Sequence, residues 1–187
     1  MAVAISDARR LTREEYERLV EEDFFAPDAR IELIHGRLVE MAPQTTFHAV
    51  GVNRVQVALG RVFRESFAVR VQLPLAIDPD SEPEPDVAVV PGEPEDYSFS
   101  HPTSAVLVVE VSESSMKIDR EKAEIYARAG IPEYWILDLR RRQLEVHRNP
   151  ENGTYASKTV LREPGFVSPL GRNERIAIAD LLPLPGR

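Results

Sequence analysis

The chain contains no cysteine among its 187 residues, so it can form neither a disulfide framework nor a thiolate metal site. A reducing cytosol is compatible with that absence. Long apolar runs are also missing, because the longest, residues 105–109, falls far short of the roughly 20 residues that span a bilayer. Residues 1–10 lack the apolar segment of a signal peptide. These absences predict a cytoplasmic protein with no membrane partner.

An excess of basic residues is missing as well, since the formal net charge is −8. Eight acidic residues and no basic residue lie between positions 78 and 96. Removing these eight from the 31 acidic residues leaves 23, which balance the 23 basic residues. One acidic segment on a neutral body favours a cation site. It does not indicate a DNA-binding face, which usually shows a basic excess.

The length and the 43% hydrophobic content suit one domain with a sizeable core. We expect this domain to cover residues 1–187, with its core at about 30–148. Residues 11–22 have helical spacing, and Thr12 and Glu15 form a capping-box pattern at the start. Residues 30–41 alternate around a His35-Gly36 turn, which predicts a hairpin. Further strands are expected at 154–162 and 174–179.

The centre of the chain predicts the order helix, three strands, helix, strand. The first helix starts at Thr45 or Thr46 and ends near Arg64. Its expected buried stripe is Val50, Val57, Leu59, Val62 and Phe63. Strands are expected at 68–77, 86–90 and 105–111. A helix capped by Asp119 or a nearby serine then ends before Gly130, and 133–139 with 143–148 predict a second hairpin. The pattern indicates a protein in which helices and strands alternate, of the α/β class.

Glu110 is the least expected residue in this pattern. The strand at 105–111 is apolar on both faces, as at the centre of a covered sheet. A carboxylate at its end is costly to bury unless it is paired or binds a cation. Asp86 begins a neighbouring strand, and Lys122 is expected in the first turn of the helix that follows Glu110. Two carboxylates and a lysine are the groups found in sites that cut phosphodiesters with a metal ion.

The chemistry of that reaction explains these residue types. Two carboxylates can hold Mg²⁺, with Mn²⁺ as a possible substitute, and the ion lowers the pKa of a bound water. A nearby lysine can orient the water or stabilise developing negative charge. Each residue also has an ordinary explanation, since Pro-Asp dipeptides are common, Glu110 could reach solvent, and Lys122 could be a solvated helix lysine. By the same reasoning Glu32 suits a solvated strand face, and His48 suits an ordinary polar position.

Several motifs resemble a known group of enzymes. Pro85-Asp86 followed by Glu110-Val111-Ser112 resembles the PD-(D/E)XK nuclease superfamily. Four longer stretches resemble the Uma-type family of restriction endonucleases: IELIHGRLVEM with the following Phe47-His48, PEPDVAVV, VVEVSESS and DREKAEIYARAGIPEYWILD. The likeness covers about residues 30–146. It implies a restriction-endonuclease-like core, with a central mixed sheet flanked by helices, an N-terminal helix and hairpin, and extra C-terminal strands.

The resemblance also implies roles for particular residues. Asp86, Glu110 and the backbone carbonyl of Val111 are expected to bind the metal ion. Glu32 and His48 match positions of the family and are expected in the site as well. These assignments follow from the resemblance and not from the residue pattern alone.

The position of the catalytic lysine departs from the basic superfamily pattern. Ser112 stands where that lysine often lies, and the resemblance places it on the helix at Lys122. Lys117 is a lesser candidate in the turn. Tyr126, one turn beyond Lys122, is expected to pack against that lysine and position it. Glu133, Tyr134 and Trp135 are expected to be mainly structural, although Trp135 could line the cleft.

The predicted function is a metal-dependent nuclease, with DNA as the expected substrate and a homodimer as the default assembly. Two alternatives stay open, because fold does not settle function. One is a non-catalytic interaction module, which the shortage of basic residues favours and the complete set of Asp86, Glu110 and Lys122 argues against. The other is a metal-dependent hydrolase of a smaller phosphate ester, which would need less positive surface.

Overall fold

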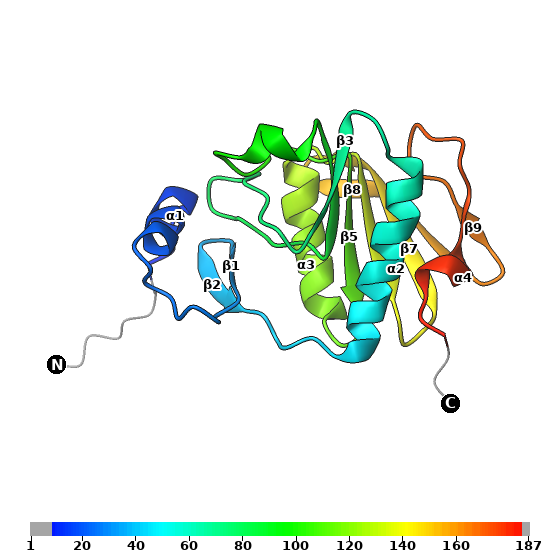
Figure 1. The fold of residues 1–187 in the computed structure, drawn as a ribbon, viewed down its shortest axis with the longest axis horizontal. Helices are drawn as coiled ribbons and strands as arrows, with labels where there is room; N and C mark the ends of the chain where they lie inside the picture. Colours follow the sequence, from blue (N-terminus) through cyan, green and yellow to red (C-terminus); the bar gives the residue numbers. More distant parts are fainter. Residues whose placement is uncertain (1–8, 185–187) are drawn as a thin grey trace.

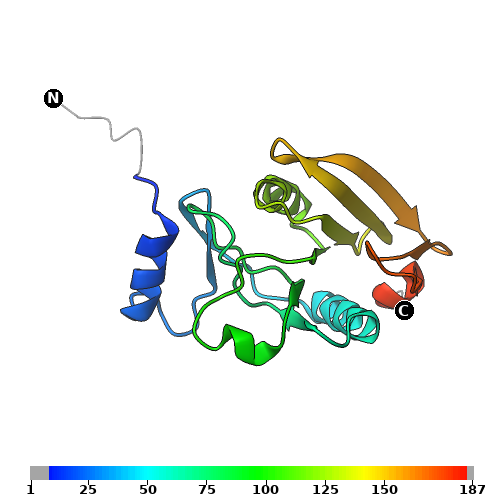
Figure 2. The same cartoon turned by 90° about the horizontal axis from the view of Figure 1, so that it is seen from above.

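A mixed sheet separates two long helices in the computed structural model, which describes residues 9–184. The six strands lie in the order β3-β4-β5-β6-β7-β8. Their bounds are Phe67–Val71, Val87–Pro91, Leu107–Ser112, Glu133–Asp138, Gln143–Glu151 and Thr154–Arg162. Only β5 and β6 pair in parallel within this sheet. Helices α2 (Thr46–Val62) and α3 (Met116–Arg128) cover its two faces (Figures 1 and 2), which confirms the predicted mixed sheet and element order.

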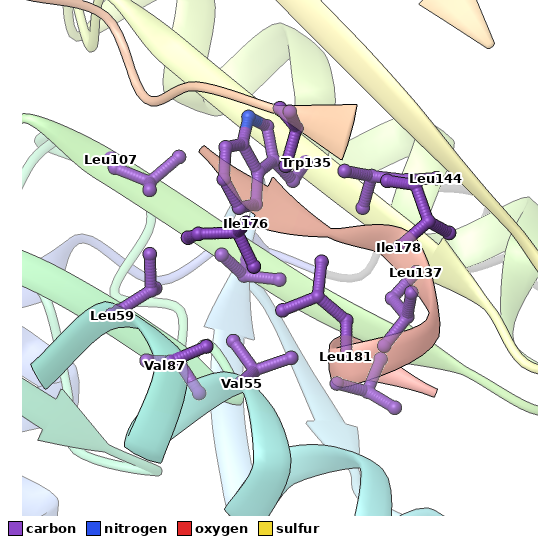
Figure 3. Close-up of a cluster of buried hydrophobic side chains, with 14 of the residues drawn as sticks. Val55, Leu59, Val87, Leu107, Trp135, Leu137, Leu144, Ile176, Ile178 and Leu181 are labelled. Carbon is purple, nitrogen blue, oxygen red and sulfur yellow. The ribbon is translucent and has the colours of Figure 1, made fainter. Parts of the chain in front are cut away.

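Alternation along β5 sends its side chains to two different cores. Leu107, Val109 and Val111 face α2, in a cluster that also holds Trp135 (Figure 3). Residue 108 faces α3 instead, and Glu110 follows it on that side because the side-chain period of a strand is two. Trp135 therefore packs in the core on the far face of the sheet from Glu110, as expected of a structural residue, and the alternative that it lines the cleft is wrong.

Helix α2 begins as predicted, because the Thr45 side chain accepts a hydrogen bond from the His48 backbone N–H. It approaches β5 so closely that a Cβ added to Gly51 would lie 3.0 Å from Val111. The predicted buried stripe is wrong in part, since Val50 and Val57 are about half exposed. The residues that face the sheet are Gly51, Val52, Val55, Ala58, Leu59 and Val62. Within residues 9–184, neither α2 nor any other helix is long and apolar enough to cross a membrane.

The N-terminal helix and hairpin lie together at one end of the molecule (Figure 2). Helix α1 (Arg13–Glu21) carries the predicted capping box of Thr12 and Glu15. As predicted, the hairpin pairs β1 (Ile31–Ile34) with β2 (Arg37–Glu40) around the His35-Gly36 turn, in which both residues have positive φ. Leu33 exchanges backbone hydrogen bonds with Glu82, which fastens β1 to the acidic loop before β4.

Two predicted strands are shorter in the structure. Strand β3 ends at Val71, opposite Val87, and not at residue 77. Gln72 has positive φ, and the chain beyond it bonds to loops instead of a strand. The strand expected at 174–179 is reduced to β10 (Ile176–Ala177), which pairs with β9 (Phe166–Val167) and leads into helix α4 (Ile178–Leu181). A short 3-10 helix, η1 (Pro94–Tyr97), lies in the loop after β4.

Candidate active site

The predicted site residues come from four different elements and the loop before β4, and they line one cavity of about 240 Å³. Glu32 lies on β1, His48 on α2, Glu110 on β5 and Lys122 on α3, while Asp86 directly precedes β4. The backbone of Val111 completes the wall. Residues spread over almost 100 positions of the sequence therefore meet at the end of β5. The structure brings all the predicted site residues together.

Backbone N–H groups fix the side chains of Asp86 and Glu110 next to each other. Antiparallel pairing sets Val87 opposite Val109, so Asp86 lies beside Glu110. The Val111 N–H donates to Asp86 Oδ2 over 2.8 Å, and the Asp86 N–H donates to Glu110 Oε2 over 3.3 Å. Both residues are more than 90% buried. The two carboxylates are thus fixed side by side at the end of the sheet.

Lys122 lies between two carboxylates. Its Nζ is 2.8 Å from Glu32 Oε2 and 3.1 Å from Glu110 Oε1. The Tyr126 hydroxyl donates to the same Glu110 oxygen over 3.0 Å, so the tyrosine bonds to the carboxylate that the lysine pairs with. Helix α3 begins at Met116, which places Lys122 in the second turn and not in the first, as the sequence had suggested. Lys117 occupies the first turn, with a side chain that is 91% exposed.

Burial controls the protonation of this group. It raises the pKa of Glu110 to about 8, against the opposing effect of Lys122, and the nearby Asp86, Asp119 and Glu32 add to the rise. Burial disfavours the charge of Lys122, but Glu110 and Glu32 outweigh it and raise the pKa of the lysine. Glu110 thus lies near three other acidic side chains, while the buried Lys122 pairs, among the described residues, only with Glu110 and Glu32. A cation or a proton is needed to balance their charge.

His48 lies against the two groups expected to bind the metal ion. Its Nε2 is 3.2 Å from Asp86 Oδ2. Burial lowers the pKa of His48, but hydrogen bonds to Asp86 and to the Val111 backbone outweigh that effect and raise it above its ordinary value. Its Nδ1 is buried and has no partner in the described part of the chain. His48 is therefore a titratable group in direct contact with Asp86.

The oxygen atoms here suit a hard cation. Asp86 Oδ1 accepts one hydrogen bond, from Gln72 Nε2 at 3.1 Å, and Glu110 Oε2 accepts one from the Asp86 N–H. A carboxylate oxygen carries two lone pairs, so each keeps one for a further partner. Between residues 9 and 184, no three histidine or acidic side chains form a ready-made metal cluster. A cation would take its other ligands from the Val111 carbonyl, water or substrate, and Mg²⁺ usually retains several waters.

Two residues of the site escaped the sequence analysis. Gln72, in the positive-φ position after β3, donates a hydrogen bond to Asp86. No local sequence pattern predicts that contact. The sequence pattern indicated Asp119 only as a helix cap. The N-cap of α3 is Ser115, and Asp119 is a buried cavity residue that accepts a hydrogen bond from the Ser115 hydroxyl over 2.7 Å. Its spacing of three residues from Lys122 puts both on one helix face, which was the available signal.

Comparisons with known proteins show the fold and the family of this chain. A crystal structure described as "a putative nuclease belonging to DUF820 from Anabaena variabilis ATCC 29413" shares the fold with a TM-score of 0.72 and 16% sequence identity, over 91% of this chain and 97% of that chain. No curated protein matches the sequence significantly. The profile of the Uma2 family, described as "Putative restriction endonuclease", matches residues 13–177. Since that match spans most of the chain, the protein belongs to the Uma2 family.

Proposed function

We propose that this protein is a nuclease that hydrolyses phosphodiester bonds with a bound divalent metal ion, Mg²⁺ by preference, and that DNA is its substrate. Membership of the Uma2 family supports nuclease activity. The observation that carries the metal dependence is the pair of buried carboxylates, Asp86 and Glu110, each with an oxygen that accepts only one hydrogen bond. Lys122 pairs with two carboxylates, and a bound cation would balance the remaining negative charge of the cavity.

Each residue has a proposed role. Asp86, Glu110 and the Val111 carbonyl would hold the ion, because they offer hard oxygen ligands. A bound Mg²⁺ supplies positive charge for the phosphoryl oxygens and lowers the pKa of a coordinated water. Lys122 stays protonated between its two carboxylates, so it acts by charge and by positioning Glu110 and not as a general base. His48 orients Asp86 through their contact.

The test is cleavage of supercoiled plasmid, single-stranded DNA and RNA, with Mg²⁺ or Mn²⁺ present or chelated. Glu110→Gln removes the charge with little change in shape and should lower the rate at least about 100-fold, because a metal ligand is weakened. Glu124→Gln makes the same chemical change on the exposed face of α3 and should cleave normally. Cleavage by Glu110→Gln at the unaltered rate would contradict the mechanism. No cleavage of any substrate with either ion would favour an interaction module.

A smaller phosphate ester is the second candidate substrate. The acidic side chains Glu40 and Glu113 also line the cavity, and they repel a polyanion more than a small ester. Bis(4-nitrophenyl) phosphate serves as the small probe. Metal-dependent hydrolysis of this diester without cleavage of any nucleic acid would assign the protein to that class.

A further inference from the structure

A second and larger cavity, of about 510 Å³, lies between α1 and the loop that carries η1. It shares no lining residue with the candidate active site. Figure 2 shows α1 and the green η1 segment at the same end of the molecule. Its walls combine carboxylates, among them Glu17, Glu82 and Glu84, with the aromatic rings of Tyr16, Tyr97 and Phe99.

Glu82 has an unsatisfied oxygen in this cavity. Its backbone is fixed by hydrogen bonds to Leu33, and the residue is only 3% exposed. Its Oε2 is buried and has no hydrogen-bond partner among residues 9–184. Burial and the neighbouring carboxylate of Glu17 raise the pKa of Glu82 to about 7, against the opposing effect of Arg13. A buried acceptor without a donor costs free energy, so a ligand that donates a hydrogen bond to this oxygen would gain affinity.

The nearby donors do not bond to Glu82. The Tyr16 hydroxyl donates to the backbone carbonyl of Ile31 over 2.6 Å. Arg13 Nη1 donates to Glu17 over 2.9 Å, and its buried Nε has no partner among residues 9–184 but makes no contact with Glu82 short enough for an ion pair. Glu84 adds a further carboxylate, and the Arg30 nitrogen closest to it is 3.8 Å away. The cavity therefore keeps an excess of negative charge after its internal ion pairs are counted.

The aromatic residues make the opposite wall suitable for a cation of organic type. Phe99 is fully exposed, and its ring would be covered by a ligand in the cavity. The Tyr97 ring already accepts one cation, since the Arg70 guanidinium lies 5.4 Å from its centroid. Rings of this kind attract planar cations that are weakly hydrated.

We propose that this cavity binds an organic cation with a planar guanidinium or amidinium group, which pairs with Glu82 while Phe99 covers the attached hydrocarbon. A planar cation of this type presents two parallel N–H donors to a carboxylate, so it can satisfy the unpaired Glu82 oxygen. The arginine side chain of a partner protein and a free small molecule share this chemistry. The proposal requires neither a metal ion nor nucleic acid and is independent of the nuclease activity.

The test is calorimetric titration of the full chain, free of divalent metal, with phenylguanidine and with its neutral analogue phenylurea. We expect phenylguanidine to bind at one site at least about tenfold more tightly, because only it forms a charge-assisted pair. Glu82→Gln should weaken this binding about tenfold, whereas Glu22→Gln, an equal charge change on the exposed end of α1, should not. Phe99→Ala changes a fully exposed side chain, so it should fold normally and also weaken binding.

A third probe, N-acetylarginine amide, separates the two sources of the cation. If it binds more tightly than phenylguanidine, the ligand is an arginine side chain, and the reverse order indicates a small molecule. Equal affinity for phenylguanidine and phenylurea would overturn the proposal. So would the absence of binding, or binding that survives both Glu82→Gln and Phe99→Ala.

Discussion

Lys122 joins the N-terminal hairpin to the central sheet, because its Nζ contacts Glu32 of β1 and Glu110 of β5 and all three side chains are buried. Removing one partner of a buried ion pair leaves an uncompensated charge. We therefore expect Lys122→Met to lower the free energy of unfolding by about 3–5 kcal/mol. Urea denaturation measures this loss. Adding Glu32→Gln and Glu110→Gln should recover much of it, and a loss below about 1 kcal/mol would show that the lysine is not structurally important.

Glu110→Gln should separate the chemistry from the folding. The amide oxygen can still accept from Tyr126, and Lys122 keeps its shorter contact with Glu32. The cavity also loses one of its crowded negative charges. The free energy of unfolding should stay within about 1 kcal/mol of the unaltered protein, while metal-dependent cleavage is lost. A variant that unfolds would make its loss of cleavage uninformative about metal binding and would contradict this stability prediction.

Glu145 should make stability fall in acid. It contacts Arg120 and Lys158 at 2.6 Å, and these hydrogen bonds outweigh burial and lower the pKa of Glu145 to about 2. A lowered acid pKa stabilises the fold above the unfolded value of about 4.3, and this stabilisation is lost as the pH falls toward 2.

The corresponding variant is Glu145→Gln. It should cost about 1–2 kcal/mol at pH 7, a figure reduced for the half-exposed Arg120 and Lys158, and roughly half as much at pH 3. Thermal unfolding at the two pH values measures the difference. Glu151→Gln, at the exposed end of the same strand, should change little at either pH. An equal cost for Glu145→Gln at pH 3 and pH 7 would rule out this ionic origin.

Salt dependence distinguishes a polymeric substrate from a small one. Binding of DNA to the Glu110→Gln variant should weaken steeply between 50 and 200 mM salt, on the order of tenfold per few phosphate contacts. Lys117 is 91% exposed next to the cavity residue Ile118, so Lys117→Gln should reduce the salt slope by about one. Arg61→Gln, on the exposed end of α2, serves as the control. Fluorescence anisotropy gives the slopes, and a flat salt response would favour a small substrate.

Local patterns predicted those features whose cause is local. The capping box of Thr12 and Glu15 and the turn at His35-Gly36 each depend on a few adjacent residues. The unusual position of Glu110 was equally visible, because strand alternation decides its face. The alternation of residues 72–77 wrongly predicted that β3 continues past Val71. A strand needs a pairing partner, and β4 begins opposite Val71, so the residues after Val71 have none in the sheet.

Features that depend on distant residues could not be predicted in the same way. Valine occurs on both sides of α2, so the buried side is chosen by packing against β5 and not by the spacing. Glu32 suits a solvated strand by itself. It is buried because the hairpin bonds to Glu82 and because Lys122 reaches it from α3. Only the family resemblance pointed to Glu32 before the structure did.

Calorimetric titration with Mn²⁺ tests the metal site most directly, because it needs no knowledge of the substrate. The full chain should bind Mn²⁺, and the double variant Asp86→Asn with Glu110→Gln should not, since it removes the charge of both proposed ligands. A control that carries Glu121→Gln and Glu124→Gln on the exposed face of α3 should bind like the unaltered protein. Binding that is lost only in the Asp86 and Glu110 variant is the predicted result. Equal binding by all three proteins, or no binding by the unaltered chain, would contradict the proposed metal site.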